Sequence, residues 1–252
     1  KNYLNENNVN FLVMKNTSSE KAGIENRGFL DGMSVAENEA YNVSFYAKAP
    51  SGYGGKIIVR LCVNGEVLAE KSIDMIKSSS MWHKYELTLT SPVSAFEGVT
   101  LQVLIDKGEV WFDMISLFPE NTFKGRENGL RNDLGIMLEE LQPKFLRFPG
   151  GCIIEGYDDN TAYDWKDSIG VDENRNPLLF NSTYGDVAAR KQGINLWTNI
   201  AATDDPLPCF MSYGLGFYEY FLLAEDIGAV GVPVLNCGLF CQMRGRGPVE
   251  MY

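Results

Sequence analysis

A charged side chain inside an apolar stretch is the first sign of chemistry in this sequence. Arg147 lies within Phe145–Phe148 (FLRF), and after one proline come Gly150, Gly151 and Cys152. Glycines let a backbone approach a ligand closely or make a sharp turn. A structural salt bridge would equally account for the arginine, turn geometry for the glycines, and a buried inert thiol for the cysteine. Ligand binding and structural roles both stay open for this run.

Tryptophans and one asparagine form a second group of candidates. Trp165 and Trp197 lie in residues 158–212, a polar stretch rich in Asn, Asp, Thr and Pro. A large aromatic ring there can stack on the apolar face of a sugar or anchor the loop to the core. Trp82, after three serines in the other half, is the best such candidate there. Asn236, which ends an apolar run, could bond ligand hydroxyls or cap a turn.

Composition argues against several kinds of protein. The 252 residues carry a formal net charge of −11, which repels phosphate backbones, so we expect no nucleic-acid partner. The single histidine, His83, argues against a catalytic triad or a multi-histidine metal site. Five scattered cysteines fit neither a disulfide framework nor a zinc spacing, and no acidic run marks a calcium loop. The apolar runs are far shorter than the ~18 residues of a membrane span. We expect no metal, cofactor or membrane span.

Residues 1–118 have the pattern of an antiparallel β-sandwich. Lys56–Val63 runs into Asn64-Gly65, the strongest short hairpin signal, with Glu66–Asp74 as its partner strand. The other expected strands are Phe11–Asn16, Gly32–Val35, Tyr41–Ala47, His83–Thr90, Val99–Asp106 and Glu109–Leu117. Many short strands with turn residues between them and no helical period predict a sandwich or jelly roll.

The pattern changes after residue 118. Asn128–Leu141 repeats apolar residues at helical spacing and is ended by Pro143. Phe145–Phe148 and Val230–Asn236 are expected to be short buried strands, and Gly216–Ile227 a second helix. Alternating helices and strands are the start of an α/β layer or a (β/α)₈ barrel, which needs eight such units.

The two ends of the sequence suggest a piece of a longer protein. Lys1 opens a polar stretch without a signal peptide, and Tyr252 follows a Gly- and Pro-rich loop. We expect a multidomain chain of the β plus α/β class. A jelly-roll β-sandwich would occupy residues 1–118, and a partial (β/α)₈ barrel segment with a long loop would occupy residues 119–252. The open edges of an incomplete barrel could support self-association.

Four ordered motifs carry a resemblance to a known family. They are Lys144–Tyr157 (KFLRFPGGCIIEGY), Tyr163–Gly170 (YDWKDSIG), Gly214–Ala229 (GLGFYEYFLLAEDIGA) and Val232–Cys241 (VPVLNCGLFC). In this order they resemble the family 51 glycoside hydrolases, the α-L-arabinofuranosidases. In the first half, Gly23–Val35 followed by Tyr41–Lys48 is similar to the carbohydrate-binding-type jelly roll inserted near the N-terminus of bacterial members.

This resemblance implies a retaining enzyme that releases terminal arabinofuranose from arabinan or arabinoxylan. Such enzymes use two carboxylates, one as nucleophile and one as acid/base. In the family both are glutamates on later barrel strands, the acid/base within an Asn-Glu pair. The pairs present here, Asn5-Glu6 and Asn38-Glu39, do not follow an apolar strand of that kind. We therefore expect no catalytic residue among these 252, and no activity from them alone.

The resemblance also implies contacts with the substrate. Arg147 matches an arginine that helps hold the catalytic carboxylates and the furanose, and Cys152 matches a position near the sugar hydroxyls. Trp197 matches an aromatic residue that lines the subsite, within a stretch longer than is common in the family. Glu155 falls where the family has no catalytic acid. The predicted substrate-binding residues are Arg147, Gly151, Cys152, Trp165, Trp197, Asn236 and Trp82.

Two functions of other classes remain as alternatives. The sandwich could be a non-catalytic carbohydrate-binding module that uses Trp82, or a structural domain that stabilises the barrel. On the enzyme reading, the partner is an arabinose-containing polysaccharide or oligosaccharide. The protein would then be secreted or periplasmic.

Overall fold

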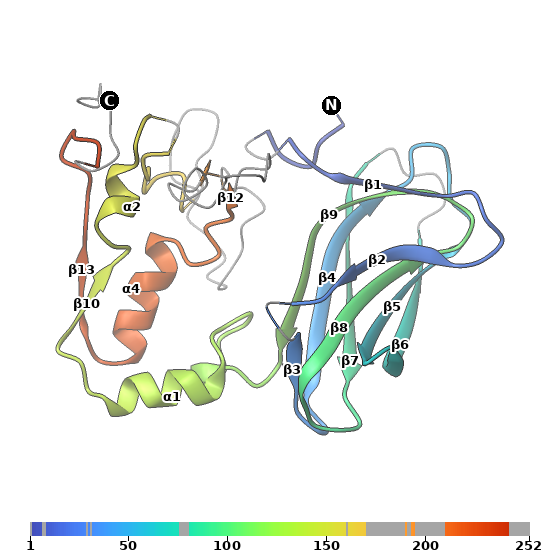
Figure 1. Cartoon of the computed structure of the whole chain (residues 1–252), viewed down its shortest axis with the longest axis horizontal. Helices are drawn as coiled ribbons and strands as arrows, with labels where there is room; N and C mark the ends of the chain where they lie inside the picture. Colours follow the sequence, from blue (N-terminus) through green and yellow to red (C-terminus); the bar gives the residue numbers. More distant parts are fainter. Residues whose placement is uncertain are drawn as a thin grey trace. The chain divides into compact units, whose positions relative to one another are not determined.

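The computed structural model describes residues 2–6, 9–28, 30, 32–75, 81–159, 161–169, 190, 193–194 and 210–241. The chain divides into two compact units, each described by itself below (Figure 1). Unit 1 comprises Lys1–Leu4 and Val9–Asn121, and unit 2 comprises Asn5–Asn8 and Thr122–Tyr252.

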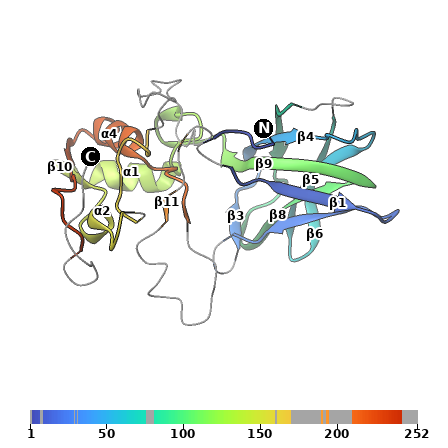
Figure 2. The same ribbon diagram turned by 90° about the horizontal axis from the view of Figure 1, so that it is seen from above.

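Unit 1 consists of two antiparallel sheets (Figures 1 and 2). The first sheet has the strand order β1 (Leu12–Asn16), β9 (Gly108–Pro119), β4 (Ala40–Lys48), β7 (His83–Thr90). The second has the order β2 (Ala22–Asn26), β8 (Ala95–Ile105), β5 (Lys56–Val63), β6 (Glu66–Asp74), and β3 (Met33–Val35) also pairs with β8. The sequence therefore predicted the strands of this unit well, apart from β2.

One hydrophobic core joins the two sheets of unit 1. Alternate residues of β4, among them Val43 and Phe45, are buried with Val59 of β5, Val103 of β8 and Phe112 of β9. Because side chains of a strand alternate between its faces, each sheet gives one face to this core. Two antiparallel sheets packed face to face form a β-sandwich.

Strand β2 escaped the sequence prediction for a physical reason. Four of its five residues are exposed, so it lacks the apolar alternation that marks a half-buried strand. Its position is fixed by backbone pairing with β8, in which Gly23 lies opposite Leu104. A Cβ at Gly23 would lie 2.0 Å from the Val103 carbonyl oxygen, so this close approach requires glycine.

Unit 2 contains helices and short strands. They are a 3₁₀ turn η1 (Phe123–Gly125), α1 (Asn132–Glu140), β10 (Phe145–Phe148), α2 (Cys152–Glu155), β11 (Gly193–Ile194), β12 (Phe210–Met211), α4 (Phe217–Asp226) and β13 (Val230–Pro233). β10 and β13 pair in parallel, with Arg147 opposite Val232. β11 and β12 form a short antiparallel pair within the stretch expected to be irregular.

The expectation that β10 and β13 are buried strands is correct for only one of their faces. Phe148 is 2% exposed and contacts three aromatic rings of α4, at Phe217, Tyr220 and Phe221. Phe145, on the opposite face, is exposed, as is Val230. The reason is that α4 covers one side of this pair, while no described residue buries the other. The described residues thus show a parallel β-α-β arrangement rather than a barrel.

Candidate functional site

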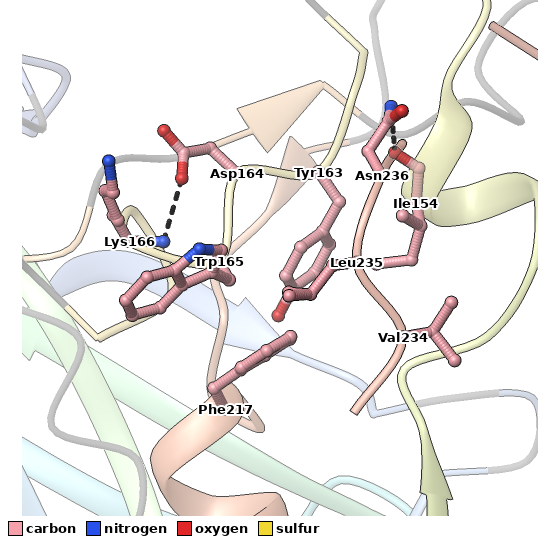
Figure 3. A pocket seen from close by; sticks show the side chains of 9 residues that line it. All are labelled: Ile154, Tyr163, Asp164, Trp165, Lys166, Phe217, Val234, Leu235 and Asn236. Atoms are coloured by element: carbon pink, nitrogen blue, oxygen red, sulfur yellow. Dashed lines mark hydrogen bonds between the residues drawn. The ribbon is translucent and has the colours of Figure 1, made fainter. Parts of the chain in front are cut away.

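A pocket lies in unit 2 where the parallel strands β10 and β13 end (Figure 3). Its volume is about 160 Å³. It is lined by Ile154, Tyr163, Asp164, Trp165, Lys166, Phe217, Val234, Leu235 and Asn236. Ligand sites of parallel α/β structures lie at the carboxyl ends of the strands, because the loops and helix N-termini converge there.

Backbone pairing brings the two sides of this pocket together. The Val234 N–H donates to the Phe148 carbonyl at 2.7 Å, which extends the pairing of β10 and β13 by one residue. The chain after β10 forms α2, which supplies Ile154. The chain after β13 supplies Val234, Leu235 and Asn236.

One wall of the pocket is aromatic. Trp165 is 37% exposed and stacks on Phe217, with ring centroids 6.0 Å apart and planes at 27°. Tyr163 also contacts Phe217, and its burial raises the pKa of its hydroxyl to about 12. An exposed indole on a buried aromatic base provides the apolar platform on which sugar rings stack.

Polar groups stand beside this wall. The Asp164 carboxylate accepts a hydrogen bond from the Lys166 backbone N–H at 2.9 Å (Figure 3). This bond ties the segment around Trp165 into a turn, with the Asp164 and Lys166 side chains beside the indole. Apolar walls with a few polar groups are typical of small-molecule sites. This arrangement can accept a small molecule that has an apolar face and polar substituents.

The Asn236 side chain forms hydrogen bonds to the backbone of the protein. Its Nδ2 donates to the Ile154 carbonyl at 3.1 Å, and its Oδ1 accepts from the N–H groups of Gly238 and Leu239. The turn-capping role considered from the sequence is thus present in the structure. Because its amide ties the chain after β13 to α2, Asn236 shapes the pocket that it lines.

A buried ion pair holds the start of α4, next to Phe217 of the pocket. Arg190 and Glu219 form two parallel hydrogen bonds of 2.9 and 2.7 Å, and Glu219 is fully buried. Glu219 Oε2 also accepts from the Gly216 N–H at 2.8 Å, and the Phe217 N–H bonds the Ser168 hydroxyl at 3.1 Å. These bonds satisfy donors at the first turn of α4, which would otherwise be unpaired.

Sequence reasoning missed both members of this pair. The position of Glu219 could have indicated its role. It is the third helical residue after Gly216, from which an acidic side chain can reach back to the backbone N–H at the helix start. Arg190 gave no such signal, because its partner is distant in the sequence.

Three predicted substrate residues lie in or next to β10. Arg147 is exposed and, by strand alternation, points to the face opposite Phe148 and α4. Gly151 is exposed, and a Cβ there would meet nothing within 4 Å. Cys152 begins α2 and is exposed rather than buried, which contradicts the alternative of a buried inert thiol. None of the three is among the residues that line the pocket described above.

Trp82 belongs to unit 1 and has structural contacts. Its indole N–H donates to the Asn2 carbonyl, and its ring contacts Phe11 edge to face. The Lys48 ammonium lies 4.9 Å from the Trp82 ring and 4.8 Å from the Trp111 ring. Through these contacts Trp82 anchors the N-terminal segment and packs against the buried ammonium of Lys48. Trp197 lies outside the described residues.

Similarity to known proteins extends along most of the chain. Residues 137–249 match a family model, the α-L-arabinofuranosidase 1 domain. An extracellular exo-α-L-arabinofuranosidase of Streptomyces chartreusis is 31% identical over 92% of this chain. α-L-Arabinofuranosidase 1 of Arabidopsis thaliana is 33% identical over 89% of it. Both relatives are named α-L-arabinofuranosidases. This finding confirms the resemblance predicted from the four motifs.

A solved structure shows the same similarity. The arabinose-bound MgGH51 α-L-arabinofuranosidase matches 98% of this chain with a TM-score of 0.79 and 27% identity. The chain spans 25% of the Streptomyces relative, 29% of the Arabidopsis relative and 36% of the solved chain. Among the described residues, no helix is long and apolar enough to cross a membrane.

Proposed function

We propose that these 252 residues are part of a retaining α-L-arabinofuranosidase of glycoside hydrolase family 51. The whole enzyme releases terminal arabinofuranose from arabinan or arabinoxylan, and its two catalytic glutamates lie outside these residues. The strongest support is the match of nearly the whole chain to an arabinose-bound α-L-arabinofuranosidase. The most buried glutamate described, Glu219, is committed to Arg190 and to the start of α4, so it is not free for catalysis.

The parallel pair β10–β13 and helix α4 form one section of a (β/α)₈ barrel in this proposal. In such a barrel the helices lie outside, and the strand face turned away from them lines the interior. The face turned away from α4 carries Arg147 of β10 together with the exposed Val230 and Val232 of β13. Arg147 would then reach the interior near the carboxyl end, where it holds the catalytic carboxylates and the sugar. An arginine fits this role because its planar fork pairs with carboxylates.

The pocket beside Trp165 is the proposed contact surface for a furanose or for an adjoining sugar of the chain. Trp165 offers the stacking platform, while Asn236 holds the segment Val234–Asn236 that lines the pocket. Gly151 and Cys152 lie next to this pocket in the sequence, and Gly151 leaves open space for a ligand. Trp197 belongs to the same proposal by its family position alone.

Binding and hydrolysis can be measured separately. Arabinoxylan oligosaccharides are titrated into the chain while tryptophan fluorescence is followed, and an aryl α-L-arabinofuranoside is offered as substrate. We expect binding without turnover. Trp165→Ala should weaken binding by about tenfold, which corresponds to ~1.4 kcal/mol for a lost stacking contact.

Trp82→Ala in the sandwich is the matched control for this titration. If Trp82→Ala removes binding and Trp165→Ala does not, the sandwich is the binding module and the pocket proposal is wrong. Turnover by the chain at the rate of a complete enzyme would show that the catalytic glutamates lie within it.

We further propose that the protein acts outside the cytoplasm on an arabinose-containing polysaccharide or oligosaccharide. The support is the Streptomyces relative, which is named extracellular. The net charge of −11 suits a neutral glycan better than a polyanion. The proposal also covers the sandwich of unit 1. We propose that it is a jelly roll that originated as an inserted carbohydrate-binding domain.

A further inference from the structure

Two cysteines and one glutamate that are far apart in the sequence meet in unit 2. The thiol sulfurs of Cys152 and Cys241 and a carboxylate oxygen of Glu155 all lie within 4.8 Å of one another. Cys152 and Glu155 stand three residues apart on α2, a spacing that puts both side chains on one face of a helix. Cys241 comes from the chain that follows β13.

Hydrogen bonds hold the third member of this cluster against α2. The Cys241 N–H donates to the Gly156 carbonyl at 2.8 Å, just beyond the end of the helix. Asn236 bonds the Ile154 carbonyl on the same helix, so the chain from Asn236 to Cys241 is attached at both ends. Preorganised ligands of this kind lose little freedom when they bind an ion.

Two thiols and one carboxylate are negatively charged when they ionise, so the ionised groups repel one another at these separations. A divalent cation at their centre would offset this repulsion, because each ionised group would then face a positive charge. Cys152 is exposed and gives an ion a path of entry, whereas Cys241 is buried.

We propose that Cys152, Cys241 and Glu155 form a site for a thiophilic divalent metal ion such as Zn²⁺. Zinc bonds thiolate sulfur at about 2.3 Å in tetrahedral geometry, which places two sulfurs ~3.8 Å apart. The observed separations, all within 4.8 Å, are therefore close to those of a bound site. Three protein ligands leave the fourth position open to water or to a ligand. Binding releases the thiol protons to solvent, one for each thiolate formed.

Sequence inspection predicted no metal, because none of these ligands has a recognisable zinc spacing. By sequence spacing alone, Cys237 is the partner to expect for Cys241, because it stands four residues before it. Cys237 does not belong to the cluster. The inference can fail or succeed separately from the proposed glycosidase function, because its test measures metal binding and not sugar binding or hydrolysis.

The test is titration of the reduced protein with Co²⁺, a spectroscopic substitute for zinc, followed by competition with Zn²⁺. We expect one cobalt per chain, a thiolate-to-cobalt charge-transfer band, and visible bands of tetrahedral intensity that zinc abolishes. Cys152→Ser and Glu155→Gln should each lower affinity by at least about tenfold, the smallest loss seen when even an outer partner of a metal ligand is removed. Cys237→Ser, an exposed cysteine outside the cluster, should change nothing.

A second measurement does not depend on the variants. Zinc should slow alkylation of Cys152 by iodoacetamide at least tenfold and leave Cys237 unaffected, as read by peptide mass spectrometry. The proposal is overturned if cobalt binds without a thiolate band, or if Cys152→Ser binds with unchanged affinity. It is equally overturned if zinc leaves Cys152 alkylation unchanged, or if Cys152 and Cys241 are recovered as a disulfide in the presence of a phosphine reductant.

Discussion

The buried carboxylate of Glu219 accepts hydrogen bonds from groups that hold the fold together. It pairs with Arg190 through both oxygens and accepts the Gly216 N–H at the start of α4. Phe217, the next residue, supplies the ring on which Trp165 stacks. The sugar-binding wall proposed above therefore depends on an ion pair that does not touch the pocket.

Removal of this carboxylate should be costly. Glu219→Gln leaves Arg190 buried without its counter-charge, and breaking one partner of a buried pair costs about 3–5 kcal/mol. We expect the free energy of unfolding of unit 2 to fall by roughly 3 kcal/mol in urea titrations followed by tryptophan fluorescence. Glu225→Gln, at an exposed position of the same helix, is the control and should have little effect. Equal stability of the two variants would contradict the structural role of the pair.

At the scale of elements, the β5–β6 hairpin is a structure that its own local sequence specifies. Asn64 and Gly65 have φ values of +49° and +87°, the left-handed conformation that a two-residue hairpin turn requires at both positions. The flanking strands have the bounds that the sequence predicts, Lys56–Val63 and Glu66–Asp74.

The hairpin turn gives a test at this scale. Gly65→Ala places a Cβ in a conformation that L-residues disfavour by about 1 kcal/mol, although the surrounding space is open. We expect the free energy of unfolding of the sandwich to fall by that amount. Gly54→Ala, also in open space but without a positive φ, should be neutral. If both variants are equally stable, backbone strain at the turn is not what selects glycine there.

At the scale of the whole molecule, the exposed apolar surface of unit 2 is the main feature. Phe145, Val230 and Val232 lie on the uncovered face of β10 and β13, and Met137 and Leu141 of the α1 region are exposed as well. Contiguous apolar surface and unpaired strand edges favour association. In the proposed barrel, further strands and helices would cover these faces.

The 252-residue chain should therefore self-associate. We expect its sedimentation coefficient to rise with concentration and Val230→Lys to reduce that rise. Phe96→Lys, which replaces an 88%-exposed aromatic of unit 1, should leave it unchanged. A monomer at every concentration would show that the uncovered strand face does not promote association.

The sequence by itself determined the strands of the sandwich other than β2, the two main helices and the similarity to α-L-arabinofuranosidases. It could do so because alternation, helical period and the Asn64-Gly65 turn act over a few residues, and because the four motifs are contiguous. Only the tertiary structure revealed β2, the Arg190–Glu219 pair and the cluster of Cys152, Glu155 and Cys241. Each of these joins segments far apart in the chain, and their contacts exist only once backbone pairing and α4 packing have brought those segments together. The same holds for Trp82, whose neighbours Asn2, Phe11 and Lys48 no local pattern could have supplied.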